Sequence, residues 1–200
     1  MELQEAMKKR RSIRKYQPRD VEDQLLEELF EAARISPSAK NRQPWRFMVL
    51  KGCEKDHVAD IMEGWFADST HEIPRYAKSS KYTAGTVREA PVLILVYRAW
   101  DAVWEVGDTL SIGAAMEHMC LRAVELGLGT LWIRDTCYTE AEICRYVGSG
   151  DLILVGGLAV GYAAEEPEER PRISREEFML SAKFEQDSVK SMADRKAVNS

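Results

Sequence analysis

The sequence is poor in the residues from which metal centres and disulfide frameworks are built. It has three histidines and four cysteines among its 200 residues. No C-x-x-C pair occurs, and no histidine has a neighbour at metal-ligand spacing. We therefore predict reduced thiols, no metal ion and no disulfide framework.

Long apolar runs are also missing. The run from Pro91 to Tyr97 is far shorter than the roughly 20 apolar residues that a transmembrane helix needs. The first residues, Met1 to Glu5, lack the charged and then apolar arrangement of a secretory signal. These absences predict a cytoplasmic location and no membrane partner.

An excess of positive charge is absent too. The formal net charge is -5 and the pI is about 5.4. Nucleic-acid binding needs a basic face that displaces counterions, so no nucleic-acid partner is predicted. A nucleic-acid module that uses Lys8 to Arg14 and Arg42 is the least favoured alternative, and steeply salt-dependent binding would support it. With 45% hydrophobic and 30% charged residues, the chain is typical of a single globular domain, residues 1–200.

Hydrophobic periodicity predicts helices that alternate with strands, which indicates an α+β or α/β sandwich. Asp20 precedes one predicted helix as a candidate N-cap. The strand 90–97 is apolar throughout and should be central in the sheet. Residues 67–86 show no sustained period. The predicted helices are 2–11, 21–35, 54–66, 108–126 and 139–147, and the predicted strands are 45–50, 90–97, 130–133 and 152–161.

Two arginine-rich segments could bind a phosphate group. Arg10, Arg11, Ser12 and Arg14 lie within five residues of one another, and guanidinium groups beside a hydroxyl suit a phosphate dianion. A second pair, Arg170 and Arg172, flanks a proline near the other end of the chain. Taken separately, each segment is explained more simply as a solvated basic surface.

Two further segments carry small or polar residues beside predicted strands. The loop 37–45 offers small residues and Ser, Asn and Gln side chains, which could read the polar edge of a flat heterocycle. The segment 127–133 begins G-L-G but has no third glycine at the dinucleotide-binding spacing, so a Rossmann site is not predicted. Either segment could simply be a connection between elements.

In combination, these features resemble the nitroreductase-like FMN flavoproteins along nearly the whole chain. The matching motifs are R-R-S-I-R, P-S-A-x-N-x-Q-P-W, a G-A-A-containing helix that ends in G-L-G-T-x-W-I, and G-Y-x-x-E-x-P-x-x-R-P-R. The resemblance implies an α+β fold, a three-layer α/β/α sandwich with a central mixed, mainly antiparallel sheet. It also implies an intimate homodimer with two FMN sites at the interface, built from both subunits.

The resemblance assigns cofactor contacts by position. It implies that the arginine segments hold the phosphate and ribityl chain, that the loop after the second helix reaches the flavin from the partner subunit, and that the segment after G-L-G-T lies along the ring. A backbone N–H near flavin N5 would orient the ring there. The helix around Gly113 to Met119 resembles the family's dimer-core helix. The implied FMN contacts are Arg10, Arg11, Ser12, Arg14, Pro37, Ser38, Ala39, Asn41, Trp132, Ile133, Arg134, Arg170 and Arg172.

The implied activity is reduction of a nitroaromatic, quinone or similar small acceptor by ping-pong hydride transfer, with NADH or NADPH as donor. The flavin carries that chemistry, so no catalytic side chain is required. Alternatives are a flavin-sequestering protein without useful turnover, a reductive dehalogenase and a flavin-fragmenting relative.

Three features of the resemblance leave details open. Many family members carry an acidic residue where this chain has Ser111, with Asp108 only nearby. Residues 67–86 would cover the active site, with Trp65, Phe66, Tyr76 and Tyr82 either stacking on a substrate or packing as a satellite core. The tail 184–200 would wrap the partner subunit or be disordered.

Overall fold

The sheet is organised around β2 (Val92–Arg98), whose residues are all buried. In the computed structural model, which describes residues 1–68, 70–72 and 80–181, the strand order is β1-β2-β4-β3 and every pair of neighbouring strands is antiparallel. The other strands are β1 (Trp45–Lys51), β3 (Gly129–Ile133) and β4 (Ile153–Gly161). The central position predicted for the strand 90–97 is confirmed.

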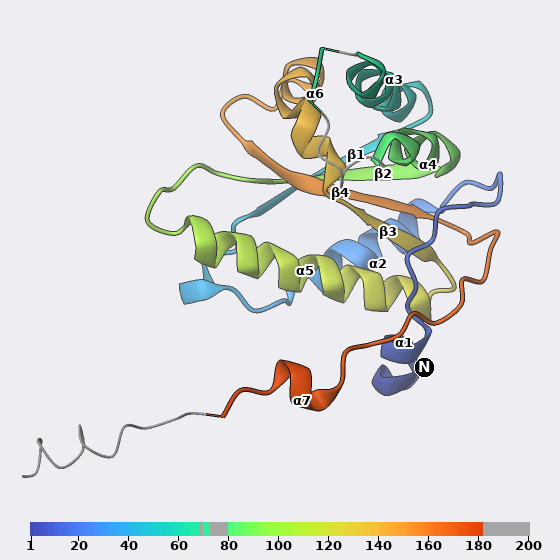
Figure 1. Cartoon of the computed structure of the whole chain (residues 1–200), viewed down its shortest axis with the longest axis vertical. Helices are drawn as coiled ribbons and strands as arrows, with labels where there is room; N and C mark the ends of the chain where they lie inside the picture. The colour runs from blue at the N-terminus through green and yellow to red at the C-terminus, as the bar shows by residue number, and fades with distance from the viewer. Residues whose placement is uncertain (69, 73–79, 182–200) are drawn as a thin grey trace, which may run out of the picture. The chain divides into compact units, whose positions relative to one another are not determined.

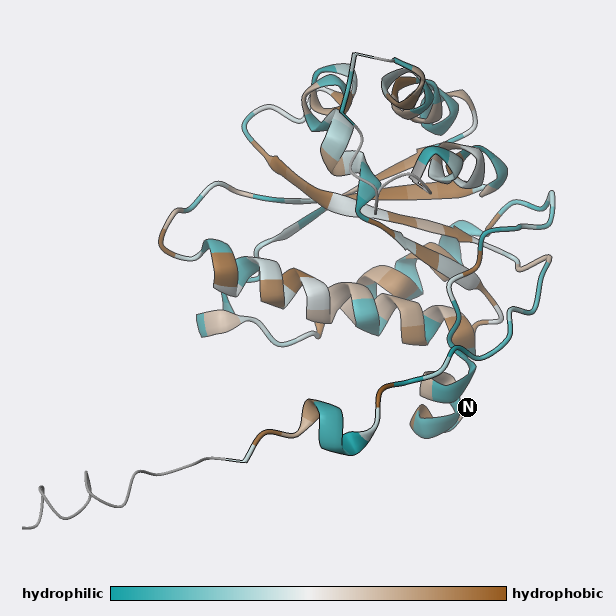
Figure 2. Cartoon of the chain, viewed as in Figure 1, coloured by the Kyte–Doolittle hydropathy of each residue, from teal (hydrophilic) through white to brown (hydrophobic). Residues whose placement is uncertain are grey.

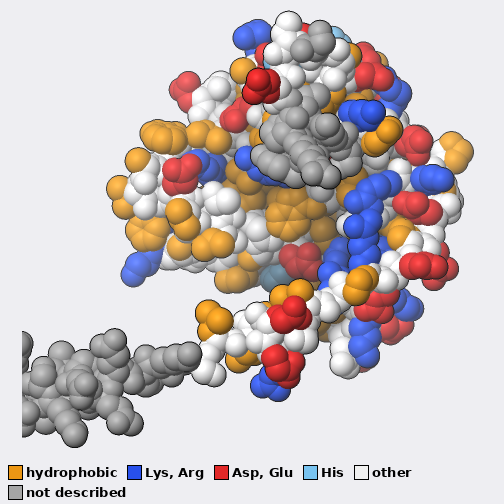
Figure 3. Space-filling model, viewed as in Figure 1, with side chains coloured by type: hydrophobic (Ala, Val, Ile, Leu, Met, Phe, Trp, Pro, Cys, Tyr) orange, Lys and Arg blue, Asp and Glu red, His pale blue; other side chains and the backbone are white. Residues whose placement is uncertain are grey.

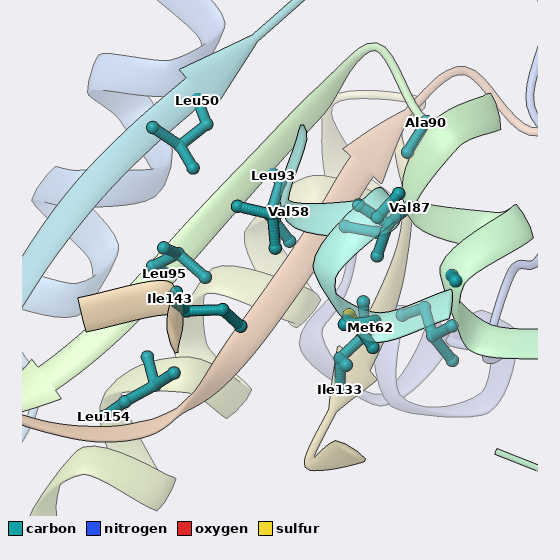
Figure 4. Close-up of a cluster of buried hydrophobic side chains, with 14 of the residues drawn as sticks. Leu50, Val58, Met62, Val87, Ala90, Leu93, Leu95, Ile133, Ile143 and Leu154 are labelled. Carbon is teal, nitrogen blue, oxygen red and sulfur yellow. The ribbon is translucent and has the colours of Figure 1, made fainter. Parts of the chain in front are cut away.

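Successive residues of β2 point to opposite faces of the sheet and enter two separate cores. Leu93 and Leu95 pack with residues of α3, α4 and α6, as the close-up in Figure 4 shows. Ile94 and Val96 pack with residues of α2 and α5 on the other face. Figure 1 shows these two helical layers on either side of the sheet, and Figure 2 shows the apolar colouring of β2 and β4. The predicted three-layer α/β/α sandwich is confirmed.

The five predicted helices are all present with bounds that differ by up to three residues, whereas the short helix at Arg175–Phe178 was not predicted. The helix predicted over 2–11 ends at Lys9, and its Leu3 and Met7 are exposed. Asp20 is not an N-cap, because Glu22 takes that position and the helix begins at Asp23. A helix over 83–89 was not predicted, since seven residues are too few for a clear period. The helices are α1 (Leu3–Lys9), α2 (Asp23–Arg34), η1 (Ala39–Asn41), α3 (Cys53–Ala67), η3 (Ser80–Tyr82), α4 (Thr83–Glu89), α5 (Glu105–Glu125), η4 (Asp135–Thr139), α6 (Glu140–Val147) and α7 (Arg175–Phe178).

Internal contacts divide the chain into two units, Met1–Pro167 and Glu168–Ser200. The first contains the sheet and both cores. In the second, α7 begins with a capping box in which the Ser174 N–H donates to Glu177 Oε2 at 2.6 Å. The assignment of residues 1–200 to one domain stays a prediction, and the predicted tail 184–200 lies outside the described residues.

Candidate functional site

The segment after α1 is fixed to the sheet by its backbone. The Ile13 N–H donates to the Thr130 carbonyl at 2.9 Å, and Ser12 forms a parallel bridge with Thr130. Gly129 makes this approach possible, because a Cβ atom there would lie 2.6 Å from Ile13 Cγ1. The R-R-S-I-R motif therefore runs alongside the first residues of β3.

The opposite side of the same segment is held by the chain that follows β4. Glu165 Oε1 accepts the backbone N–H of Arg14 at 2.5 Å and that of Lys15 at 3.1 Å. The buried Tyr16 hydroxyl donates to the Ile13 carbonyl at 2.9 Å, and burial raises the pKa of Tyr16 above its ordinary value. The glutamate of the G-Y-x-x-E motif thus positions the arginine motif, a role that the sequence alone did not indicate.

The arginines of the motif take different directions. Arg10 lies beside α5, with its Nε 3.6 Å from Glu117 Oε1. Arg14 is exposed and donates to the Ser12 carbonyl at 3.1 Å. Arg11 instead turns back toward the end of α1 and donates to the carbonyl of Lys8 at 2.5 Å. Figure 3 shows a band of Lys and Arg side chains over this segment. Arg10 and Arg14 are the arginines whose placement suits an external anion.

A pocket of about 430 Å³ lies next to Arg11 and carries both signs of charge, since Lys9, Glu165 and Glu166 also line it. A phosphate dianion favours a site with an excess of positive charge. This pocket is therefore a poor phosphate site, and the prediction for Arg11 gains no support from it.

At the end of β3, the side chain of Trp132 and the backbone of Ile133 are the groups that a ligand could contact. Trp132 is 44% exposed, although the strand was predicted to be buried. Its ring lies against α5, where a Cβ atom on Gly113 would be 3.7 Å from Trp132 Cη2. Ile133 is 1% exposed and packs in the core on the opposite face, so only its backbone is available to a ligand. Arg134 follows as an exposed residue.

The loop between α2 and β1 has an unusual backbone. Lys40, Asn41 and Gln43 have φ values of 53°, 55° and 48°, in the left-handed region that residues other than glycine seldom occupy. The Ser38 hydroxyl accepts the Gln43 N–H at 3.0 Å. Strained backbone of this kind is often found at active sites and ligand-binding sites.

Side chains from α5 hold this loop. Ser111 Oγ accepts the Ala39 N–H at 3.2 Å and donates to the Gly107 carbonyl at 2.7 Å. Arg42 forms an ion pair with the buried Asp108, with Nε 2.9 Å from Oδ1. Hydrogen bonding to Asp108 raises the pKa of the Arg42 guanidinium. Neither Arg42 nor Asp108 was predicted as a site residue. Asp108 was noted only as an acidic residue near Ser111, where many family members carry one.

The candidate residues approach α5 from nearly opposite sides. Gly113, which faces Trp132, and Glu117, which pairs with Arg10, are about 40° apart around the helix and about 6 Å apart along it. Ser111, which binds the loop, is two positions from Gly113 and therefore about 160° away. Arg10 and Trp132 therefore contact one side of α5, and the loop 37–44 contacts the other.

The remaining candidates have less defined surroundings. Arg170 and Arg172 are exposed residues of the second unit, and their grouping with Arg10 and Arg14 stays a prediction. Trp65 stacks on Tyr138 with ring centroids 4.9 Å apart and on His71 at 4.5 Å. Phe66 contacts the Trp65 and Tyr138 rings edge-on, so both aromatics pack as a satellite core.

Tyr82 is 69% exposed, whereas Tyr76 lies outside the described residues. Within residues 1–68, 70–72 and 80–181, no group of His, Cys, Asp or Glu side chains could hold a metal ion. No helix in that part of the chain is both long and apolar enough to cross a bilayer.

The fold and these surfaces define an α/β/α sandwich with an arginine segment fixed to one sheet edge. The chain belongs to the nitroreductase family, whose model matches residues 7–162. A Methanothermobacter thermautotrophicus protein, provisionally named NADH dehydrogenase/NAD(P)H nitroreductase, is 32% identical over 135 residues, 66% of this chain and 60% of that protein. The chain therefore spans about three-fifths of that relative's length.

Two further similarities cover more of each protein. The iodotyrosine deiodinase of Thermotoga neapolitana is 27% identical over 181 residues, which are 85% of this chain and 93% of that enzyme. A crystal structure of a Desulfovibrio desulfuricans protein, provisionally named nitroreductase and solved in complex with FMN, has a TM-score of 0.72 at 28% identity. It covers 92% of this chain and 99% of that one.

Proposed function

We propose that the chain is an FMN-dependent oxidoreductase that takes electrons from NADH or NADPH and passes them to a nitroaromatic, quinone or similar small acceptor. The observation that carries this proposal is the placement of Arg10 and Trp132 on one side of α5, with the arginine segment fixed along β3. Family membership and a solved relative in complex with FMN support the same assignment.

The described residues fit FMN in both chemistry and spacing. Arg10, Arg14 and Ser12 offer cationic and hydroxyl groups for the phosphate. Trp132 and the backbone from Ile133 to Arg134 offer an aromatic face and an N–H group for the ring. Thr130 and Ile133 are three residues apart, or about 10 Å along the strand, a span that a ribityl chain and its phosphate could cover. We expect Arg170 and Arg172 to add to the phosphate site.

The loop 37–44 would complete the site of a second copy. Because this loop lies on the other side of α5 from Trp132, it is poorly placed to reach a flavin held by the arginines of its own chain. We therefore propose a homodimer in which Pro37, Ser38, Ala39 and Asn41 contact the partner's flavin.

An exposed apolar strip on α5 gives this dimer a surface. Val106 and Leu110 are 73% and 71% exposed and lie one turn apart. Val103 precedes them at 85% exposure, and Figure 3 shows apolar side chains gathered over this end of the helix. Ala115, Met116 and Met119 face their own chain's core instead, and Gly113 faces its own chain's Trp132, so the dimer contact would use the exposed apolar strip and Ala114 rather than those residues.

In the proposed reaction, FMN supplies the hydride-transfer chemistry when it is bound. The protein binds and orients it. Arg10 and Arg14 would hold the phosphate, and Trp132 would restrict the ring to one plane. The donor and the acceptor would occupy one pocket in turn, which predicts ping-pong kinetics. The positive field of the arginines should also shift the midpoint potential of the bound flavin from that of free FMN.

An absorption spectrum followed by anaerobic addition of NADH, and separately of NADPH, tests the proposal. We expect flavin bands that bleach with at least one donor, and release of FMN on denaturation. Bound FMN that does not bleach would favour flavin sequestration without turnover. A colourless protein that does not bind added FMN would overturn the proposal. Assays of the reduced protein with nitroaromatics, quinones and iodotyrosine would then identify the acceptor class.

A further inference from the structure

We infer that Arg42 and Asp108 are positioning residues, which hold the loop 37–44 in its left-handed conformation before any flavin binds. This inference rests on the proposed function, because the loop is assigned to the cofactor on that basis. It adds a pair of residues that contact no cofactor themselves and act through the backbone between Ser38 and Gln43.

The loop needs an external constraint. Its three left-handed residues are Lys40, Asn41 and Gln43, and none of them is the glycine that adopts this conformation without steric cost. Strained conformations persist only when the surrounding structure over-determines them. Within the loop, the Ser38 hydroxyl accepts the Gln43 N–H at 3.0 Å, and the backbone N–H groups of Asn41 and Arg42 donate to carbonyls three residues back at 3.0 and 3.1 Å. These are short-range bonds within an exposed loop, and alone they would leave it free to populate other conformations.

The ion pair with α5 has the geometry to supply that constraint. Arg42 Nε donates to Asp108 Oδ1 at 2.9 Å, and Nη2 donates to Oδ2 at 3.1 Å. This two-point contact fixes the orientation of the guanidinium as well as its distance. The Asp108 side chain is 3% exposed, so the loss of its partner would leave a buried carboxylate without compensation. Breaking this pair should therefore cost more than breaking an ordinary surface ion pair.

Arg42 also connects the loop to the turn before α5. Its Nη2 donates to Asp101 Oδ2 at 2.8 Å, and its guanidinium lies 5.0 Å from the centroid of the Trp104 ring. Asp101 Oδ1 in turn accepts the backbone N–H of Val103 and of Trp104 at 3.0 and 3.2 Å. One guanidinium thus ties the loop, the helix and the turn together. A lysine, with a single ammonium group, cannot make these contacts at the same time.

The test compares Arg42→Lys and Asp108→Asn with Arg88→Lys. Arg88 is a matched control, since its Nη2 also lies near two carboxylates, Asp60 Oδ1 at 2.9 Å and Glu63 Oε2 at 3.0 Å. It joins α4 to α3, in the helical layer on the other face of the sheet from α5. The measurements are the dissociation constant for FMN, the visible circular dichroism of the bound flavin and the melting temperature of the apoprotein.

We expect Arg42→Lys and Asp108→Asn to weaken FMN binding about tenfold, because apparent affinity falls with the fraction of loops in the competent conformation. The flavin circular dichroism should change as well, while Arg88→Lys leaves both unchanged at a similar melting temperature. Adding Lys40→Gly to Arg42→Lys should recover part of the lost affinity, since glycine removes the steric cost of the left-handed backbone.

Two outcomes separate failure of this inference from failure of the proposed function. Wild-type protein that does not bind FMN would overturn the proposed function. Wild-type protein that binds FMN, together with variants that bind it as tightly as Arg88→Lys does, would overturn the positioning role alone. If Asp108→Asn does not fold, Arg42→Lys and its Lys40→Gly combination still decide the question.

Discussion

The two segments proposed to contact FMN are held in place in different ways. The arginine segment is fixed through its own backbone, by the Thr130 carbonyl on one side and the Glu165 carboxylate on the other. The loop 37–44 is held largely by side chains of α5, Asp108 and Ser111. Backbone anchoring survives most changes of side chain, whereas the loop depends on individual residues. Substitutions should therefore affect the two segments differently.

The largest expected effect comes from the arginine segment. The double variant Arg10→Gln/Arg14→Gln removes two cationic donors, each worth about 1.5–3 kcal/mol when it pairs with a charged group. FMN binding should weaken about 100-fold or more, with little change in stability, because the backbone contacts remain. Titration of apoprotein with FMN measures this. Arg145→Gln, on the exposed face of α6, is the control, and an equal loss of affinity there would contradict a specific phosphate contact.

A smaller effect is expected where the arginine segment meets β3. Gly129→Ala would place a Cβ atom 2.6 Å from Ile13 Cγ1, and overpacking of this kind destabilises by about 1–3 kcal/mol. Gly64→Ala, in α3 with open space around the added methyl group, should instead stabilise by about 0.5–1 kcal/mol. Chemical denaturation measures both. Equal effects at the two glycines would show that contact with Ile13 does not fix the segment.

Loss of the Ser111 hydroxyl alone should disturb the loop 37–44. Ser111→Ala removes the acceptor of the Ala39 N–H, which should cost about 1 kcal/mol and weaken FMN binding about fivefold. Thr109→Ala is the matched control, since Thr109 Oγ1 also donates four residues back, to the Glu105 carbonyl at 2.8 Å. FMN titrations of the two variants give the comparison. If both bind FMN equally well, Ser111 does not act on the loop.

The smallest expected effect is a difference in thiol reactivity between Cys120 and Cys53. Cys120 is 4% exposed, and burial raises the pKa of its thiol to about 11. Cys53 is exposed. Because the thiolate is the reactive form, native protein at pH 8 should be alkylated at Cys53 long before Cys120, as peptide mass spectrometry would show. Rapid labelling of Cys120 would mean that the core between α5 and the sheet opens readily.

The contrast between local backbone contacts and long-range side-chain contacts also explains what the sequence could predict. Periodicity located the four strands of the sheet and most helices, because β2 and most of β4 are buried on both faces. The arginine motif was recognisable because its residues are contiguous. The contacts of Arg42 with Asp108 and of Arg14 with Glu165 join residues that are 66 and 151 positions apart. No local pattern encodes such pairs, and they depend on the completed fold.

The buried side chain of Ile133 shows a second limit. The motif that contains Ile133 was recognised, yet which of its side chains face solvent depends on the phase of a five-residue edge strand. A shift by one residue would exchange the faces of Trp132 and Ile133. The strand itself was predicted, but that phase was not.

The central claim is that each flavin site combines the arginine segment of one copy with the loop of another, and mixed dimers test it most directly. One chain carries Arg10→Gln/Arg14→Gln and the other Ser38→Leu/Asn41→Leu, with different affinity tags for purification of the mixed dimer. At FMN concentrations that just saturate the wild-type dimer, neither homodimer should retain FMN. The account predicts that the mixed dimer regains a single intact site and binds one flavin. A mixed dimer that binds none, although the wild-type dimer does, would place both segments in the site of one chain and contradict the account.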